Sequence, residues 1–328
     1  MTFLTIDHLT AEVRYTLAGI FAALVIASLV ARILQRTKPD KTFRELRLRI
    51  RTWWVIAGLF SLAIILSRGA SLFFLAFVSF LALKEFLSLV PTRRADHRVL
   101  FLAYLSIPFQ YLWVYLEWYG MFIIFIPVYL FLLLPTRMVL IGETDGFLRA
   151  IGTLHWGLMT TVFSLSHAAM LLVIHPIDSA RYKPVWPSEA GVLHPGSGLL
   201  ILLVLLTQSN DVSQYIWGKT LGRRKVVPKV SPAKTLGGLA GGVATTMLLA
   251  TTLGPYLTFL DWKRALFAGT IVGLSGFAGD VSISALKRDL GVKDSGTMLP
   301  GHGGILDRID SLTYTAPLYF HFIFYCYC

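Results

Sequence analysis

The chain alternates between long apolar runs and short polar connections. A helix that crosses a bilayer needs about 20 mainly apolar residues, and ten runs fit that pattern closely enough to predict transmembrane helices. The second run is short, and if it forms a re-entrant hairpin with the third, nine crossings remain. The ten predicted helices cover residues 15–34, 53–67, 70–89, 99–117, 119–134, 151–174, 198–217, 237–259, 265–284 and 311–327.

Composition supports the same fold class. Hydrophobic residues make up 55% of the 328 residues and charged residues 15%, whereas soluble domains average about 45–50% apolar and about 25% charged residues. A soluble core of this size could not absorb so much apolar sequence. We therefore predict an all-α polytopic integral membrane protein.

Positive charge predicts how the chain is oriented. If the N-terminus is outside, the inner loops are 32–52, 84–98, 135–150, 218–236 and 285–310, and they contain 24 of the 30 lysine and arginine residues. Lysine and arginine mark the cytoplasmic side of short loops, which favours a bacterial inner membrane and leaves the eukaryotic endoplasmic reticulum as an alternative. This orientation, with attraction to anionic lipid, also accounts for the net charge of +12, so no nucleic-acid partner is expected.

Polar character is unevenly distributed along the chain. Residues 1–206 are mostly apolar runs, which predicts a transmembrane scaffold, and residues 207–328 hold nearly all the polar clusters, which predicts a catalytic transmembrane region. Within the scaffold, residues 36–51 carry Phe43, Leu46 and Ile50 at helical spacing among basic residues. That pattern predicts an amphipathic helix along the inner membrane interface.

The first polar cluster spans residues 208–214, near the inner end of the seventh run. Asp211 is costly at membrane depth and is therefore a candidate for function. Asn210 has an alternative interpretation, because asparagine and serine often form hydrogen bonds between transmembrane helices.

The second cluster is the basic segment from Gly218 to Gly242. Its residues Ser231 to Thr235, SPAKT, predict a phosphate-gripping turn that enters a helix, although orientation alone would explain a basic loop. The fragment GKT at 218–220 is not a P-loop, because the upstream glycine and the preceding strand are absent.

The third cluster lies between residues 280 and 310. Asp280, Ser284 and Lys287 share one helix face with Arg288, and Asp307 and Asp310 share another. Carboxylates from two helices could hold a divalent cation, with phosphate oxygens and waters completing its shell. Glycines at 301, 303 and 304 allow close backbone approach to a ligand.

These residues resemble the phosphatidate cytidylyltransferase family, also called the CDP-diacylglycerol synthases. The resemblance covers about residues 205–311 and includes Asn210, Asp211, the segment from Gly218, and SPAKT. Its C-terminal part consists of Ser284, Lys287, Arg288, Lys293, Asp294, Pro300, His302, Gly303, Gly304, Asp307, Arg308 and Asp310.

The resemblance implies that CTP donates a cytidylyl group to phosphatidic acid in phospholipid biosynthesis, releasing pyrophosphate. It implies Mg²⁺ as cofactor, held by Asp280, Asp307 and Asp310, with a second, monovalent cation left open. The implied catalytic residues are Asp280, Lys287, Arg288, His302, Asp307 and Arg308. The implied substrate-binding residues are Asn210, Asp211, Lys219, Ser231, Lys234, Thr235, Ser284, Lys293, Asp294, Gly303 and Gly304.

Two positions depart from the family pattern, which commonly has glutamate where this chain has Gly237 and Ile283. These differences leave open a CTP-using enzyme that acts on another lipid phosphate or alcohol. A transporter with a buried charged pathway is a further alternative, although it predicts polar residues spread through several helices. A homodimer is compatible with the sequence.

Overall fold

The computed structural model describes residues 9–37, 43–91, 97–142, 144–175, 177–178, 183–184, 196–296, 298 and 303–328. The described chain is mainly helical. Its only described strands pair antiparallel, with Ile177 opposite Pro184. The elements are α1 (Ala11–Thr37), α2 (Arg44–Leu66), α3 (Arg68–Leu89), α4 (His97–Tyr115), α5 (Tyr119–Ile124), the π-helical η3 (Phe125–Leu130), α6 (Phe131–Val139), α7 (Phe147–Leu158), the π-helical η4 (Met159–Phe163), α8 (Ser164–Met170), η5 (Leu171–Val173), β1 (Ile177–Asp178), β2 (Lys183–Pro184), α9 (Gly196–Thr220), α10 (Leu236–Leu257), α11 (Trp262–Asp289), α12 (Leu306–Ile309) and α13 (Leu312–Tyr327).

The predicted fold class is confirmed, because all ten predicted segments are helical. Among the described residues, eight helical stretches are long and apolar enough to cross a membrane. The helices α4 and α13 are not among them. With 16 residues, α13 extends for about 24 Å at 1.5 Å per residue, less than the bilayer core of about 30 Å.

The start of α2 differs from the prediction. We expected residues 36–51 to form a separate interfacial helix, but residues 44–51 are the first turns of α2, which continues to Leu66. Long basic side chains can hold their charges at the polar rim while the helix itself passes on into apolar surroundings. With 23 residues in α2 and 22 in α3, both helices have spanning length, so length gives no reason to expect a re-entrant hairpin.

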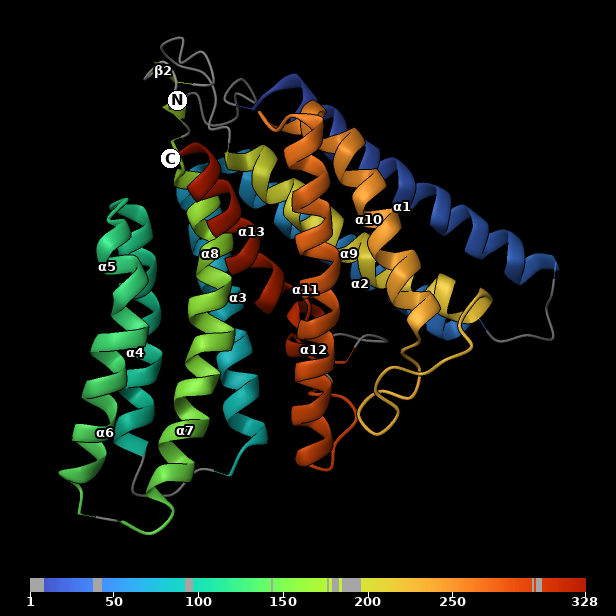
Figure 1. The fold of residues 1–328 in the computed structure, drawn as a ribbon. Coiled ribbons are helices and arrows are strands. Elements are labelled where there is room, and N and C mark those ends of the chain that lie inside the picture. The colour runs from blue at the N-terminus through green and yellow to red at the C-terminus, as the bar shows by residue number, and fades with distance from the viewer. Residues whose placement is uncertain are drawn as a thin grey trace.

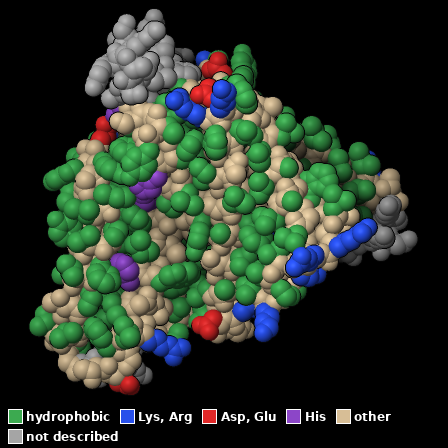
Figure 2. Space-filling view, viewed as in Figure 1, with side chains coloured by type: hydrophobic (Ala, Val, Ile, Leu, Met, Phe, Trp, Pro, Cys, Tyr) green, Lys and Arg blue, Asp and Glu red, His purple; other side chains and the backbone are tan. Residues whose placement is uncertain are grey.

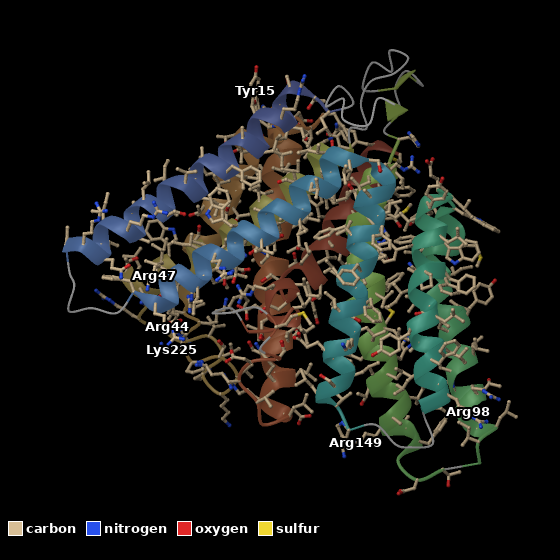
Figure 3. All side chains as sticks on the ribbon, turned by 180° about the vertical axis from the view of Figure 1, so that it is seen from behind. Tyr15, Arg44, Arg47, Arg98, Arg149 and Lys225 are labelled. Atoms are coloured by element: carbon tan, nitrogen blue, oxygen red, sulfur yellow. The ribbon has the colours of Figure 1, made fainter. Side chains whose placement is uncertain are left out.

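The chain runs back and forth between two ends of the molecule (Figure 1). Helix α1 begins and α13 ends at one end, while α2 and α10 begin and α11 ends toward the other, which we call the site end. A broad apolar surface lies between them, with lysine and arginine gathered near its edges (Figure 2). In Figure 3, Tyr15 lies near one end, whereas Arg44, Lys225 and Arg149 lie toward the site end. The described parts of the predicted inner loops therefore lie toward the site end (Figure 3).

Helices α9, α10 and α11 pack closely through small residues. A Cβ atom added to Gly269 would lie 2.9 Å from Met247 Cα, and one added to Gly273 would lie 3.1 Å from Val243 Cα. Small residues let transmembrane helices gain van der Waals contact at short range. Asn210 joins all three helices, since its Nδ2 donates to Gly273 O and its Oδ1 accepts from Thr246, both at 3.2 Å. This rigid trio positions the site.

Candidate functional site

A cavity of about 1040 Å³ opens at the site end. Ligand pockets typically enclose roughly 300–1,000 Å³, so this one is large enough for a sizeable ligand. Its walls come from α2, α9, α11 and the segment that follows α11. The lining residues are Glu45, Leu46, Arg49, Ile50, Trp53, Gln208, Asp211, Val212, Tyr215, Asp280, Lys287, Lys293, Asp294, Gly296, Gly303, Asp307, Arg308 and Asp310.

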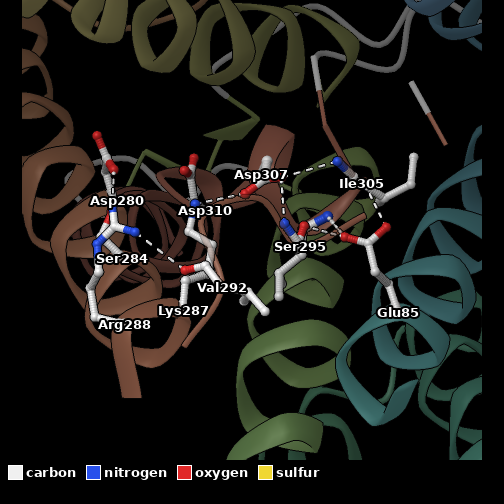
Figure 4. Close-up of polar contacts among 12 residues, drawn as sticks. Glu85, Asp280, Ser284, Lys287, Arg288, Val292, Ser295, Ile305, Asp307 and Asp310 are labelled. Atoms are coloured by element: carbon white, nitrogen blue, oxygen red, sulfur yellow. Dashed lines mark hydrogen bonds and ion pairs between the residues drawn. The ribbon is translucent and has the colours of Figure 1, made fainter. Parts of the chain in front are cut away.

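One ion pair in the cavity wall joins α11 to α12. Lys287 Nζ lies 2.6 Å from Asp307 Oδ1, and Asp307 Oδ2 accepts hydrogen bonds from the amides of Ser295 at 2.9 Å and Gly304 at 3.0 Å (Figure 4). Burial alone would raise the pKa of Asp307, but the hydrogen bonds from Lys287 and the two amides outweigh it and lower that pKa. Asp307 is therefore a carboxylate whose two oxygens are both occupied.

A second ion pair joins the residue before the N-cap of α10 to α11. Lys234 Nζ pairs with Asp280 Oδ2 and donates to Gln214 Oε1 at 2.9 Å. Ser284 donates to Asp280 Oδ1 at 3.2 Å, one turn further along the helix. Thr235 caps α10, because its Oγ1 accepts from Gly238 N at 3.1 Å. The cap fixes where α10 begins and thereby holds Lys234 beside α11.

Two further carboxylates approach Asp280. Ser311 Oγ donates to Asp211 Oδ1 at 2.9 Å, and Ser311 N donates to Asp310 Oδ1 at 2.7 Å. The absence of a side chain at Gly279 allows this approach, since a Cβ there would lie 2.5 Å from Asp310 O. Burial, followed by the negative charges of Asp280 and Asp211, raises the pKa of Asp310 well above its ordinary range. A bound cation would relieve this repulsion.

The carboxylates have the right chemistry for Mg²⁺, which takes oxygen ligands and usually keeps several waters. Within the described residues, no three His, Cys, Asp or Glu side chains are arranged so that they could hold a metal as they stand. Asp211, Asp280 and Asp310 fit a cation best, because their negative charges repel one another, whereas Asp307 is already held by Lys287 and two backbone amides. The predicted ligand set of Asp280, Asp307 and Asp310 stays a prediction.

Several predicted residues lie away from the cavity wall. Arg288 is exposed and donates to Val230 O and Val292 O, both at 3.3 Å. Lys219 is exposed and lies over the Tyr215 ring, 4.4 Å from its centroid. Ser231 is bound through its main chain to Val227 O at 2.9 Å. Of the other predicted residues, Asn210 and Thr235 are buried, and His302 lies outside the described residues.

The sequence interpretation missed two contributions from the first half of the chain. The start of α2 supplies an apolar strip and the charged pair Glu45 and Arg49 to the cavity, and the helical spacing of Leu46 and Ile50 was the available signal. Glu85 of α3 is 8% exposed and accepts hydrogen bonds from the segment that leads into α12. A carboxylate in an apolar run was its signal, although the neighbouring Lys84 suggested the beginning of a loop.

Packing explains the two departures from the family pattern. A Cβ added to Gly237 would lie 2.8 Å from Leu221 O and 3.0 Å from Leu221 C, so a glutamate there would collide with the end of α9. Ile283 is fully buried in α11, where a glutamate would need hydrogen-bond partners to offset its desolvation.

The fold and the cavity together define a class of protein: a polytopic helical membrane protein whose cavity combines lysines and arginines suited to phosphate groups with carboxylates suited to a cation. Residues 47–326 match the sequence profile of the cytidylyltransferase family. The chain belongs to this family, which favours an enzyme, a nucleotidyltransferase, over a transporter.

Individual relatives match to different extents. The chain is 49% identical over 311 residues to the uncharacterized protein YnbB of Escherichia coli (strain K12), covering 95% of this chain and 98% of YnbB. It is 34% identical over 199 residues to the phosphatidate cytidylyltransferase of Haemophilus influenzae, covering 52% of this chain and 66% of that enzyme. Against the phosphatidate cytidylyltransferase of Synechocystis it is 39% identical over 144 residues, covering 42% and 48%. The chain thus spans only part of the length of these two named enzymes.

Proposed function

We propose that this protein transfers the cytidylyl group of CTP to phosphatidic acid, giving CDP-diacylglycerol and pyrophosphate. The observation that carries the proposal is a single cavity with two kinds of wall. Leu46, Ile50 and Trp53 of α2 form an apolar strip, while Lys287, Asp307 and other charged groups line another part of the same cavity. A nucleotide needs the charged wall, and the glycerol and acyl portion of a lipid needs the apolar one.

The reaction requires positioning more than acid–base chemistry. An oxygen of the phosphatidic acid phosphate attacks the α-phosphorus of CTP, a new phosphorus–oxygen bond forms there, and the bond to the β-phosphate bridge breaks to release pyrophosphate. The attacking phosphate is already an anion at neutral pH. Lys234, Lys287 and Arg308 would therefore act by holding phosphate charges and aligning the two substrates.

Mg²⁺ belongs to the proposal as well. Asp211, Asp280 and Asp310 would hold it, and when bound it supplies positive charge that offsets the charge of the phosphate oxygens. A second, monovalent cation stays a prediction.

The site end would face the cytoplasm of a bacterial inner membrane. The support is the positive charge of the loops at that end, which contain 24 of the 30 lysine and arginine residues, together with the positive-inside rule. CTP is water-soluble and would reach the cavity from that side. A homodimer stays a prediction, which light scattering of the detergent-solubilised protein would test.

The direct test is pyrophosphate release by purified protein in nanodiscs, with CTP and Mg²⁺, in the presence and absence of phosphatidic acid. We expect release only when phosphatidic acid is present, together with transfer of an α-phosphate label into lipid. A parallel panel contains lysophosphatidic acid, diacylglycerol and a long-chain alcohol. Activity with an alcohol but not with phosphatidic acid would support the alternative acceptor, and no activity with any lipid would overturn the proposal.

A further inference from the structure

Glu85 is a buried carboxylate of α3 that meets the segment leading into α12. Its Oε2 accepts a hydrogen bond from Ile305 N at 2.8 Å, and its Oε1 accepts from Leu306 N at 3.1 Å and from Ser295 Oγ (Figure 4). A buried carboxylate is tolerated only when donors compensate for its lost hydration. Here the chain provides three such donors.

The same segment also binds Asp307. The amide of Ser295 donates to Asp307 Oδ2 at 2.9 Å while its hydroxyl donates to Glu85. Along the backbone, Gly304 N donates to Asp307, and the next two amides, those of Ile305 and Leu306, donate to Glu85. Consecutive amides are thus divided between two carboxylates, so the orientation of Asp307 depends on where Glu85 holds the backbone.

Two glycines make room for the Glu85 carboxylate. A Cβ atom added to Gly304 would overlap it, and one added to Gly296 would lie 3.2 Å from Glu85 Oε2. Glycine at these positions lets the backbone close around the carboxylate. Glu85 itself is not among the residues that line the cavity, so it acts behind the wall.

We propose that Glu85 is a positioning residue for the cytidylyl transfer. It holds Ser295 and the start of α12 in place, so that Asp307 presents its Oδ1 to Lys287 at 2.6 Å in the cavity wall. The inference rests on the proposed function. It adds that α3, which lies in the half of the chain predicted to be a scaffold, helps to set the position of Lys287, the lysine proposed to hold phosphate.

The principal variant is Glu85→Gln, which keeps the shape of the side chain but replaces an acceptor oxygen with an amide group that cannot accept from the backbone. We expect kcat to fall about 10- to 100-fold, as when a group that orients an active-site residue is lost. The matched control is Ser79→Ala in the same helix, which removes the buried hydrogen bond of 2.8 Å to Tyr111 OH. Its kcat should stay close to that of the wild type.

Two further variants approach the contact from the other side. Gly304→Ala should reproduce the loss in Glu85→Gln, because its Cβ displaces the carboxylate, and the double variant should lose little more than either single variant. Ser295→Ala removes one donor, should give a smaller loss, and keeps the test usable if Glu85→Gln does not fold.

Hydrogen exchange separates this inference from the proposed function. Peptides covering residues 303–310 should exchange faster in Glu85→Gln than in the wild type. In Ser79→Ala their exchange rates should not change. Both results are expected whether or not phosphatidic acid is the substrate. A wild-type protein that releases no pyrophosphate overturns the proposed function. Wild-type exchange rates in Glu85→Gln, or a kcat loss no greater than that of Ser79→Ala, overturn the role of Glu85.

Discussion

Two lysines near the cavity each pair with one carboxylate: Lys234 with Asp280, and Lys287 with Asp307. Partly buried partners of this kind stabilise each other as a pair, because removing one leaves a charge without its partner. A polyphosphate that enters the cavity would compete with the carboxylates for the same ammonium groups. The pairs therefore hold the lysines ready for an anionic ligand.

Asp280→Asn should abolish Mg²⁺-dependent turnover while leaving the protein folded and inserted, because it removes a negative charge near Asp211 and Asp310. Asp289→Asn at the exposed end of the same helix is the matched control and should retain activity. Pyrophosphate release over a range of Mg²⁺ concentrations measures both variants. Full activity of Asp280→Asn would contradict a cation site at this carboxylate.

Gly237 allows a second test at the scale of single residues. Gly237→Glu restores the residue common in the family but should destabilise this protein by about 1–3 kcal/mol, the usual cost of overpacking, because the side chain would meet Leu221 O. Leu236→Glu adds the same charge at an exposed neighbouring position and should change stability little. Thermal unfolding in detergent compares the two, and equal stability would contradict the packing explanation.

Sequence reasoning identified many residues of the cavity wall but not the contacts behind them. Asp280, Lys287 and Asp307 stood out through helical spacing and a motif confined to one stretch of chain. Glu85 did not, because its partner Ser295 lies 210 positions away, and a single sequence contains no record of such a pairing. Arg288 and Lys219 were expected at the site but lie exposed, away from the cavity wall. Their directions depend on how α11 and α9 are rotated, which a single sequence does not show.

At the scale of elements, α2 has the largest consequence. Its apolar center spans the membrane, while its basic first turns line the cavity. The hydrophobic pattern located the apolar part but did not show that the basic turns belong to the same helix. Hydropathy separates charged turns from an apolar run even when one helix contains both. The helix thereby brings the apolar strip of Leu46, Ile50 and Trp53 to the same cavity wall as Arg49.

Arg49→Ala should raise the KM for phosphatidic acid more than it lowers kcat, because Arg49 lies on the cavity wall beside the apolar strip and can meet a lipid phosphate. Arg51→Ala is the matched control: it removes an exposed arginine two positions away that does not line the cavity. Initial rates at varied mole fractions of phosphatidic acid in nanodiscs give both constants. Equal effects of the two substitutions would indicate general attraction to anionic lipid instead.

At the scale of the whole molecule, the carboxylate cluster lies deeper than the site end, where α11 ends. Gly279 packs against Asp310. Along the axis of α11 it lies about 15 Å from the last residue of the helix, Asp289, at 1.5 Å per residue. Short α12 and α13 make this possible, because together they begin beside α11 instead of beyond its end (Figure 1). A recessed site can meet a lipid headgroup at the depth of the membrane interface while water-soluble CTP enters from the end.

The orientation of the molecule follows from the same arrangement and can be measured with cysteine labelling. Cys326 and Cys328 carry free thiols, so both are first replaced by serine and only the introduced cysteine can be labelled. Two exposed lysines then serve as a matched pair: Lys225→Cys at the site end and Lys263→Cys in the first turn of α11 at the opposite end.

In intact bacterial cells, a membrane-impermeant maleimide should label Lys263→Cys at once, and should label Lys225→Cys only after the inner membrane is permeabilised. The physical reason is that the basic loops at the site end are retained on the cytoplasmic side. Inside-out vesicles should reverse the two results, which controls for differences in thiol reactivity. If Lys225→Cys is labelled in intact cells and Lys263→Cys is not, the cavity faces away from the CTP pool, and the proposed entry of the nucleotide is excluded.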